Sequence, residues 1–83
     1  MEKYIMYTVY AISSINRNYI YVGLTNDFNR RFNEHNRGKE KTTRPYAPFT
    51  VLYRETAVTR PRARVREKYL KSGIGKEFLK SLV

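Results

Sequence analysis

The sequence contains no cysteine, and only 7 of its 83 residues are Asp or Glu. Without cysteine there can be no disulfide and no zinc-thiolate site, and this composition is typical of a cytoplasmic protein. Long hydrophobic runs are missing as well: the longest, at residues 4–12, is far shorter than the roughly 20 residues that span a membrane. That run also lacks the small-residue cleavage site of a secretory signal. We therefore expect a cytoplasmic protein with no membrane-spanning segment.

Positive charge, in contrast, is abundant. Seventeen Lys and Arg residues give the chain a formal net charge of +10. Such a surface attracts polyanions by releasing their counterions, so nucleic acid is the first expected partner and an acidic membrane surface the second. The alternative is a basic face that is only solvated. The candidate contacts to nucleic acid are Arg30, Arg31, Arg37, Lys39, Lys41, Arg44 and Arg66.

The length predicts a single domain over residues 1–83. A chain of this size buries only about 60–65% of its unfolded surface, so the core will be thin. Hydrophobic residues at 41% and aromatic residues at 14% are sufficient for that core and argue against disorder. Contacts to phosphates carry no sequence information, so a narrow target would require a protein partner.

The hydrophobic pattern predicts an α+β domain. Strands are expected at residues 4–12, 19–23 and 49–55, with a polar turn at 13–18 between the first two. Thr25 or Asn26 is expected to cap a first helix that Gly38 ends, and residues 39–48 to form a loop. A second helix is expected from Thr59 to Lys71 and a third at 74–82. The prediction is a three-stranded antiparallel sheet flanked by helices, in the order β-β-α-β-α-α.

Polar residues occur on the apolar faces of two expected helices. Arg31 and His35 share a face with Phe28 and Phe32, where a charged or titratable group costs energy unless it is paired or functional. The alternative is that Arg31 extends past the phenylalanines to solvent and that His35 is a surface residue near the helix end.

Glu67 lies at helical spacing between Ala63 and Leu70, in a stretch rich in arginine. A carboxylate on that inward face could ligate Mg²⁺, which takes only one or two protein carboxylates with waters and phosphate oxygens. The alternative is an intrahelical ion pair with Lys71, which would contribute only a few tenths of a kcal/mol.

The complete set of motifs resembles the GIY-YIG nuclease family. Thr8-Val9-Tyr10 corresponds to Gly-Ile-Tyr, and Tyr21-Val22-Gly23 corresponds to Tyr-Ile-Gly. Arg31, eight residues after the second motif, matches the catalytic arginine of the family. His35 matches a position that is usually His or Tyr, and Glu67 matches the metal-binding glutamate. Residues 38–45 and the chain length are similar to those of the small stand-alone bacterial members.

The resemblance implies metal-dependent cleavage of DNA, an activity used in DNA repair. Glu67 would hold one Mg²⁺ or Mn²⁺ ion against the phosphate. Tyr10, assisted by His35, would orient or deprotonate the attacking water. Arg31 would stabilise the charge of the pentacoordinate phosphorus, and Tyr21 would complete the hydrogen bonds around the phosphate. We expect these five side chains to converge in one exposed concave site.

Three positions depart from the family pattern. Thr8 replaces the first glycine, Leu24 stands where excision-repair members have lysine, and Thr42 stands where many stand-alone members have tyrosine. Two other functions therefore stay open. One is a non-catalytic nucleic-acid-binding module with the same fold, and the other is a basic structural protein, such as a ribosomal component, with no metal dependence.

Overall fold

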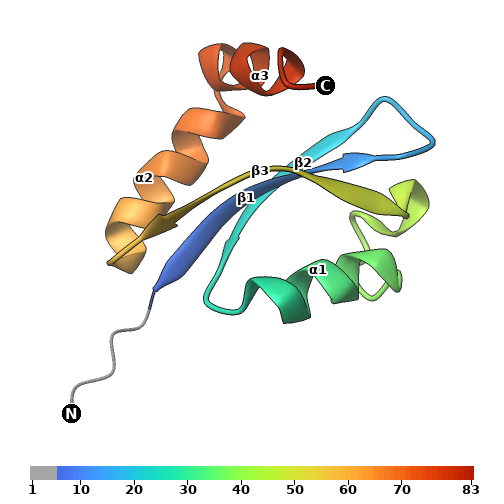
Figure 1. Ribbon diagram of the computed structural model, residues 1–83, viewed down its shortest axis with the longest axis horizontal. Coiled ribbons are helices and arrows are strands. Elements are labelled where there is room, and N and C mark those ends of the chain that lie inside the picture. The colour runs from blue at the N-terminus through green and yellow to red at the C-terminus, as the bar shows by residue number, and fades with distance from the viewer. Residues whose placement is uncertain (1–5) are drawn as a thin grey trace.

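The computed structural model describes residues 6–83 and contains one antiparallel sheet with helices on both faces (Figure 1). Its strands are β1 (Tyr7–Ser14), β2 (Ile20–Thr25) and β3 (Phe49–Ala57), with β1 in the centre. Its helices are α1 (Phe28–Asn36), α2 (Arg60–Lys71) and α3 (Gly73–Lys80), and a short 3-10 helix, η1, spans Arg44–Tyr46. The predicted α+β class and the order β-β-α-β-α-α are confirmed.

Most of the element boundaries lie within a few residues of those expected. β1 continues to Ser14 because its last residues still pair with β3, whereas a turn was expected from residue 13. Residues 4 and 5 of the predicted first strand lie outside the described residues. Asp27, rather than Thr25 or Asn26, caps α1 by accepting a hydrogen bond from a backbone N–H of the first turn.

The end of α1 is a Schellman motif built on Gly38, as the glycine predicted. Gly38 has a φ of +73°, and its N–H donates to the His35 carbonyl at 3.2 Å. The N–H of Lys39 donates to the Glu34 carbonyl at 3.0 Å. This reversal brings residues 40–43 back to the side chains of Arg31 and His35.

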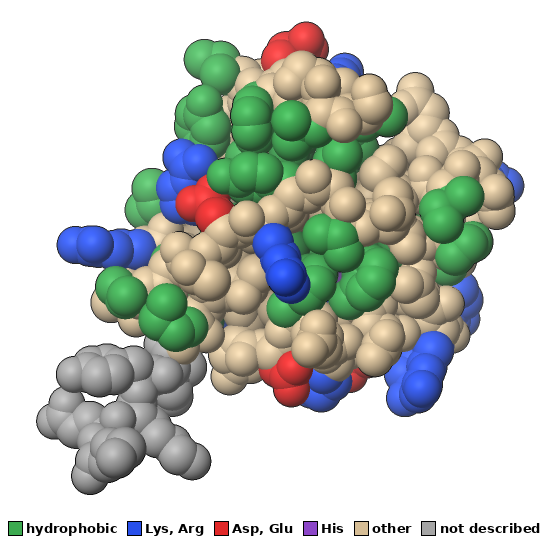
Figure 2. All heavy atoms as spheres, in the orientation of Figure 1, with side chains coloured by type: hydrophobic (Ala, Val, Ile, Leu, Met, Phe, Trp, Pro, Cys, Tyr) green, Lys and Arg blue, Asp and Glu red, His purple; other side chains and the backbone are tan. Residues whose placement is uncertain are grey.

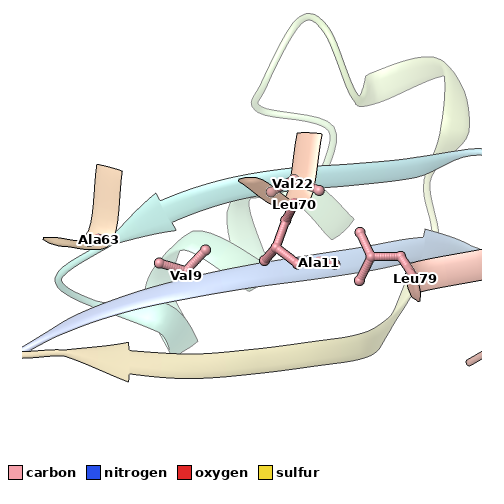
Figure 3. Close-up of a cluster of buried hydrophobic side chains, with 6 residues drawn as sticks. All are labelled: Val9, Ala11, Val22, Ala63, Leu70 and Leu79. Carbon is pink, nitrogen blue, oxygen red and sulfur yellow. The ribbon is translucent and has the colours of Figure 1, made fainter. Parts of the chain in front are cut away.

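One face of the sheet packs against α2 and α3. Val9 and Ala11 of β1 and Val22 of β2 point toward these helices, which contribute the remaining three members of the cluster (Figure 3). Those three are Ala63, Leu70 and Leu79. α3 leaves Ile74 and Phe78 partly exposed, and hydrophobic side chains gather over that end of the molecule in Figure 2.

The opposite face of the sheet packs against α1. Tyr10 and Ile12 of β1 form a second cluster with Phe49, and the α1 residues Phe28 and Phe32 pack against it. Because successive strand residues point to opposite faces, β1 is covered on both sides, as its continuous apolar run predicted. Over the described chain, no helix is both long and apolar enough to cross a membrane.

Candidate active site

Four of the five predicted catalytic residues lie together between the sheet and α1. Tyr10 comes from β1, Tyr21 from β2, and Arg31 and His35 from α1. The His35 ring centroid is 4.9 Å from that of Tyr21 and 5.9 Å from that of Tyr10. The Tyr10 hydroxyl is hydrogen-bonded to His35 Nε2 at 2.9 Å. The tyrosines of both motifs therefore lie against the same α1 side chain, His35.

The last residue of the second motif, Gly23, makes room for the first tyrosine. Gly23 pairs with Tyr10 across β1 and β2. A Cβ atom built on Gly23 would lie 2.6 Å from Tyr10 Oη and 2.8 Å from Cζ. The Tyr10 phenol therefore lies directly against the β2 backbone, a position that only glycine allows.

His35 is held from its second nitrogen by Thr43, a residue that the sequence analysis did not identify. His35 Nδ1 lies 2.8 Å from Thr43 Oγ1, and both residues are fully buried. The alternative that His35 is a surface residue near the helix end is therefore wrong. Thr43 lies in the segment expected to be a loop, where no hydrophobic period distinguishes it from its exposed neighbour Thr42.

Arg31 is clamped between two carboxylates that the sequence analysis also missed. Its guanidinium donates to Glu34 at 3.1 Å and to Glu40 at 3.0 Å, and its side chain remains 28% exposed. Burial alone would lower the pKa of Arg31, but the hydrogen bonds to Glu40 and Glu34 raise it overall. Arg31 therefore keeps its charge at any working pH, and a phosphate would have to compete with these carboxylates for it. The spacing of three from Arg31 to Glu34 was the one sequence signal for this clamp.

Burial keeps both members of the Tyr10–His35 pair neutral. It raises the pKa of Tyr10 far above its ordinary value, an effect to which Tyr21 adds and which Arg31 opposes. It lowers the pKa of His35, and the Arg31 charge acts in the same direction against Glu40 and Glu34. At neutral pH the resting site thus holds a phenol and an uncharged imidazole, joined by one hydrogen bond.

The expected convergence of all five side chains is not observed, because Glu67 forms no hydrogen bond or ion pair with the other four residues. It projects from α2, which covers the opposite face of the sheet, and its two carboxylate oxygens pair with Arg64 at 2.9 Å and with Lys71 at 3.3 Å. The ion pair with Lys71 is the alternative that the sequence left open. The charge of Glu67 contributes to raising the Tyr10 pKa, so the two groups still interact through space.

The expected exposure of the site is wrong. Tyr10 is 1% exposed and His35 is fully buried, so neither reaches the surface. A surface hollow of about 470 Å³ lies elsewhere, between the end of β3 and α2. In the site itself, solvent reaches Arg31 and the two carboxylates that bind it, Glu34 and Glu40, whereas the Tyr10 phenol and the His35 imidazole are buried.

The predicted nucleic-acid contacts fall into two groups. Arg66 makes three hydrogen bonds of 2.9–3.2 Å to the Glu55 carboxylate, which fasten α2 to β3. Arg30 and Arg44 are exposed but engaged: Arg30 pairs with Asp27, which caps α1, and with Glu34 of α1, and Arg44 donates to the Gly38 carbonyl at 2.7 Å. The others are exposed and, within residues 6–83, form no ion pair: Arg37, Lys39 and Lys41.

A single carboxylate, that of Glu67, is available to bind a divalent cation within the described residues. In the described part of the chain no three His, Asp or Glu residues lie close enough together to form a metal-binding cluster. Glu67 is the only buried carboxylate there, and one carboxylate suits Mg²⁺, which retains several waters. Glu67 therefore fits such an ion, provided that the ion displaces Arg64 and Lys71 from the carboxylate oxygens.

Comparison with known proteins agrees with this arrangement. The family model described as the GIY-YIG catalytic domain matches residues 6–77. The UPF0213 protein BH0048 from Bacillus halodurans, known from a solution NMR structure, is 31% identical and superimposes with a TM-score of 0.55. That match covers 93% of this chain and 84% of the other. No curated protein matches significantly. With a family match over most of its length, and with the tyrosines of both motifs on one face of the sheet, the chain belongs to the GIY-YIG family.

Proposed function

We propose that this protein is a metal-dependent endonuclease that hydrolyses DNA phosphodiester bonds. The observation that best supports the proposal is the Tyr10–His35 hydrogen bond beneath Arg31. A surface that only bound DNA would need the arginine, but it would gain nothing from a phenol paired with a neutral imidazole. Phosphoryl transfer to water requires both a fixed positive charge and a proton acceptor.

Each side chain has a role in this proposal. Arg31 binds the phosphate and stabilises the negative charge that develops on it. The Tyr10 oxygen accepts a proton from the attacking water, and His35 accepts the proton that Tyr10 releases. Tyr21, half-buried beside His35, donates a hydrogen bond to the phosphate.

Glu67 would hold Mg²⁺ or Mn²⁺. Such an ion supplies Lewis-acid polarisation of the phosphate when it is bound. In the free protein, Arg64 and Lys71 already pair with the Glu67 carboxylate, so they keep it charged and a metal ion must displace them. Metal binding should therefore be weak without DNA and tighter with it, because phosphate oxygens complete the coordination.

The proposal is tested by Glu67→Gln and Arg31→Ala. Glu67→Gln keeps the size of the side chain and removes the charge that anchors the cation. Cleavage of plasmid DNA in Mg²⁺ or Mn²⁺ should fall by roughly 100-fold or more, while DNA affinity holds or rises slightly because the surface loses a negative charge. Arg31→Ala should reduce cleavage as strongly and also weaken binding.

Glu77→Gln is the matched control, because Glu77 is an exposed α3 residue with 78% of its side chain accessible. It should leave cleavage unchanged. Cleavage that survives Glu67→Gln at the wild-type rate would point to a contaminating nuclease or to another metal site, and would overturn the role of Glu67.

The second candidate function is a non-catalytic nucleic-acid-binding module. The observation that favours it is that Arg31 and Glu67 are both neutralised by neighbouring charges, and that Tyr10 is buried. Wild-type protein that binds DNA but cuts no duplex, branched or single-stranded substrate in either metal would establish this function instead.

A further inference from the structure

A chain of hydrogen bonds runs from Tyr10 into the turn at residues 40–43. Beyond the bond from the Tyr10 hydroxyl to His35 Nε2, the imidazole Nδ1 meets Thr43 Oγ1 at 2.8 Å. The Thr43 hydroxyl in turn donates to the Glu40 backbone carbonyl at 3.4 Å. Tyr10, His35 and Thr43 are each at most 1% exposed. These buried polar atoms therefore depend on one another for their hydrogen bonds.

The Glu40 carbonyl gives this series of hydrogen bonds its direction. It accepts the single Thr43 hydroxyl proton at 3.4 Å, in addition to the backbone N–H groups of Thr43 at 3.2 Å and Arg44 at 2.9 Å. The Thr43 oxygen then accepts from His35, which places the imidazole proton on Nδ1. In a neutral imidazole the other nitrogen is an acceptor, so Nε2 receives the proton of the Tyr10 hydroxyl. Burial, which lowers the pKa of His35, favours this neutral form.

We infer that Thr43 is a positioning residue of this site: it fixes His35 as the Nδ1–H tautomer, so that Tyr10 donates inward and its oxygen faces the substrate as an acceptor. The catalytic part of this inference rests on the proposed nuclease function. With the other tautomer, Nε2–H would donate to Tyr10, the phenolic proton would point outward, and Tyr10 could not take a proton from water.

The proton transfer balances along this chain. As the water oxygen bonds to phosphorus, its proton moves to the Tyr10 oxygen while the Tyr10 proton moves to His35 Nε2, which produces an imidazolium. The phosphorus–oxygen bond to the leaving group breaks, and that oxygen takes a proton from solvent. The Nδ1–H bond to Thr43 persists throughout. The other groups facing the imidazole are Tyr21, Arg31, Glu34 and Glu40.

Glu40 contacts both Arg31 and Thr43, and so connects the arginine to the series of hydrogen bonds that includes Tyr10 and His35. Its carbonyl orients Thr43, and its carboxylate binds Arg31 at 3.0 Å and accepts the Thr42 backbone N–H at 3.4 Å. The turn at residues 40–43 thus places both the arginine and the imidazole. Substitution of the Glu40 side chain should therefore affect phosphate binding through Arg31, whereas substitution of Thr43 should affect proton transfer through His35.

The test exploits the fact that His35 is the only histidine in the chain. Nitrogen-15 NMR of the imidazole reports directly which nitrogen carries the proton, without assignment against other histidines. In wild-type protein at pH 7 we expect a protonated Nδ1 and an unprotonated Nε2. Thr43→Val keeps the shape but removes the hydroxyl, so the population should shift toward Nε2–H. Thr43→Ser should restore the wild-type signals, and Thr42→Val, at the exposed neighbour, should leave them unchanged.

Cleavage supplies the second readout. Thr43→Val should lower kcat on the order of 100-fold with little change in KM, and Thr43→Ser should restore most of it. A wild-type imidazole protonated on Nε2, or Thr43→Val signals identical to wild type, would overturn the inference whatever the activity. Wild-type protein with the expected tautomer but no cleavage would overturn the proposed function and the catalytic purpose of Thr43, and would leave the tautomer assignment standing.

Discussion

Gly23 contributes to the site by having no side chain, which leaves room for the Tyr10 phenol. The Tyr10 phenol occupies the volume where a Cβ atom would stand, and its hydrogen bond to His35 holds it there. A side chain at this position would have to displace either the buried ring or the β2 backbone. The glycine of this motif is therefore a packing requirement of the first tyrosine.

Gly23→Ala should separate Tyr10 from His35. We expect a loss of about 1–3 kcal/mol in the free energy of unfolding, measured by urea denaturation, because the site is overpacked. The His35 imidazole signals should move as well, since Nε2 loses its partner. Gly73→Ala is the matched control, because a Cβ there meets no atom within 4 Å. Equal stability of the two variants would contradict the close contact at Gly23.

His35 should make stability depend on pH. Its pKa in the folded protein lies below the ordinary value of about 6.5. Below pH 6.5 the unfolded chain therefore binds a proton that the folded protein excludes, and the free energy of unfolding falls as the pH decreases toward the folded pKa. Urea denaturation at pH 8, 7, 6 and 5 would measure this decline.

His35→Gln supplies the comparison for the pH series. It should be less stable at pH 7, and it should lose the decline between pH 7 and 5 because glutamine does not titrate. The lowered pKa values of Glu40 and Glu55, caused chiefly by Arg31 and Arg66, act at more acidic pH. Wild-type stability that increased from pH 7 to 5 would show that His35 is charged in the folded state.

Among the elements, the cationic side chains of the segment that follows α1 differ from Arg66 of α2 in whether a carboxylate already binds them. Arg37, Lys39 and Lys41 are exposed, whereas Arg66 is engaged with Glu55 and lies 4.8 Å from the Tyr69 ring centroid. An arginine held by a carboxylate gains less from a phosphate because it must give up its first partner. The segment at residues 37–41 is therefore a better candidate for phosphate contacts than Arg66.

DNA binding should show this difference in its dependence on salt. Wild-type protein contacting about five phosphates should give a slope of log affinity against log salt near −4.5 for any duplex sequence. Replacing Arg37, Lys39 and Lys41 together by Gln should reduce that slope by about 2.7. Arg66→Gln should leave the slope nearly unchanged and lower the unfolding free energy instead. A slope near zero for wild type would mean that the basic face is only solvated.

The elements were largely predictable because each has a local signal. Short apolar runs rich in tyrosine and β-branched residues identified all three strands. The second helix was expected to begin at Thr59, which caps α2 by accepting the Arg62 N–H. The end of α1 followed from Gly38. The exact caps differed where several good capping residues occur in succession, as at residues 25–27, because tertiary contacts choose among them.

The site was less predictable because hydrophobic period reports which face a residue occupies and not how deep it lies. Tyr10, Arg31 and His35 were placed on the correct faces, but the burial of His35 depends on the turn that Thr43 closes over it. That turn lies in a basic stretch without hydrophobic periodicity, where the sequence predicts every polar residue to be equally exposed. The clamp on Arg31 by Glu40 spans nine residues and has no local signal.

Across the whole molecule, the two helical layers differ in what they contribute to the core and to the candidate site. α2 and α3 complete the larger apolar cluster, whereas α1 and the turn at residues 40–43 surround the candidate site. Apart from Glu67 of α2, the proposed metal ligand, substitutions in the first layer should act mainly through folding, and those in the second through the proposed activity. Contacts to phosphates carry no sequence information, so a narrow target would depend on a partner.

The central position of β1 constrains how DNA could reach Tyr10. β1 is hydrogen-bonded to a strand on each side and covered on both faces, so its amides should be among the last in the protein to exchange with solvent. Opening the sheet to expose the phenol would amount to unfolding the protein. Any opening that leaves the fold intact must therefore occur in α1 and the residues that follow it. Under the proposed nuclease function, turnover can be no faster than that local opening, and a variant that opened ten times more slowly would show a lower kcat with its chemistry untouched.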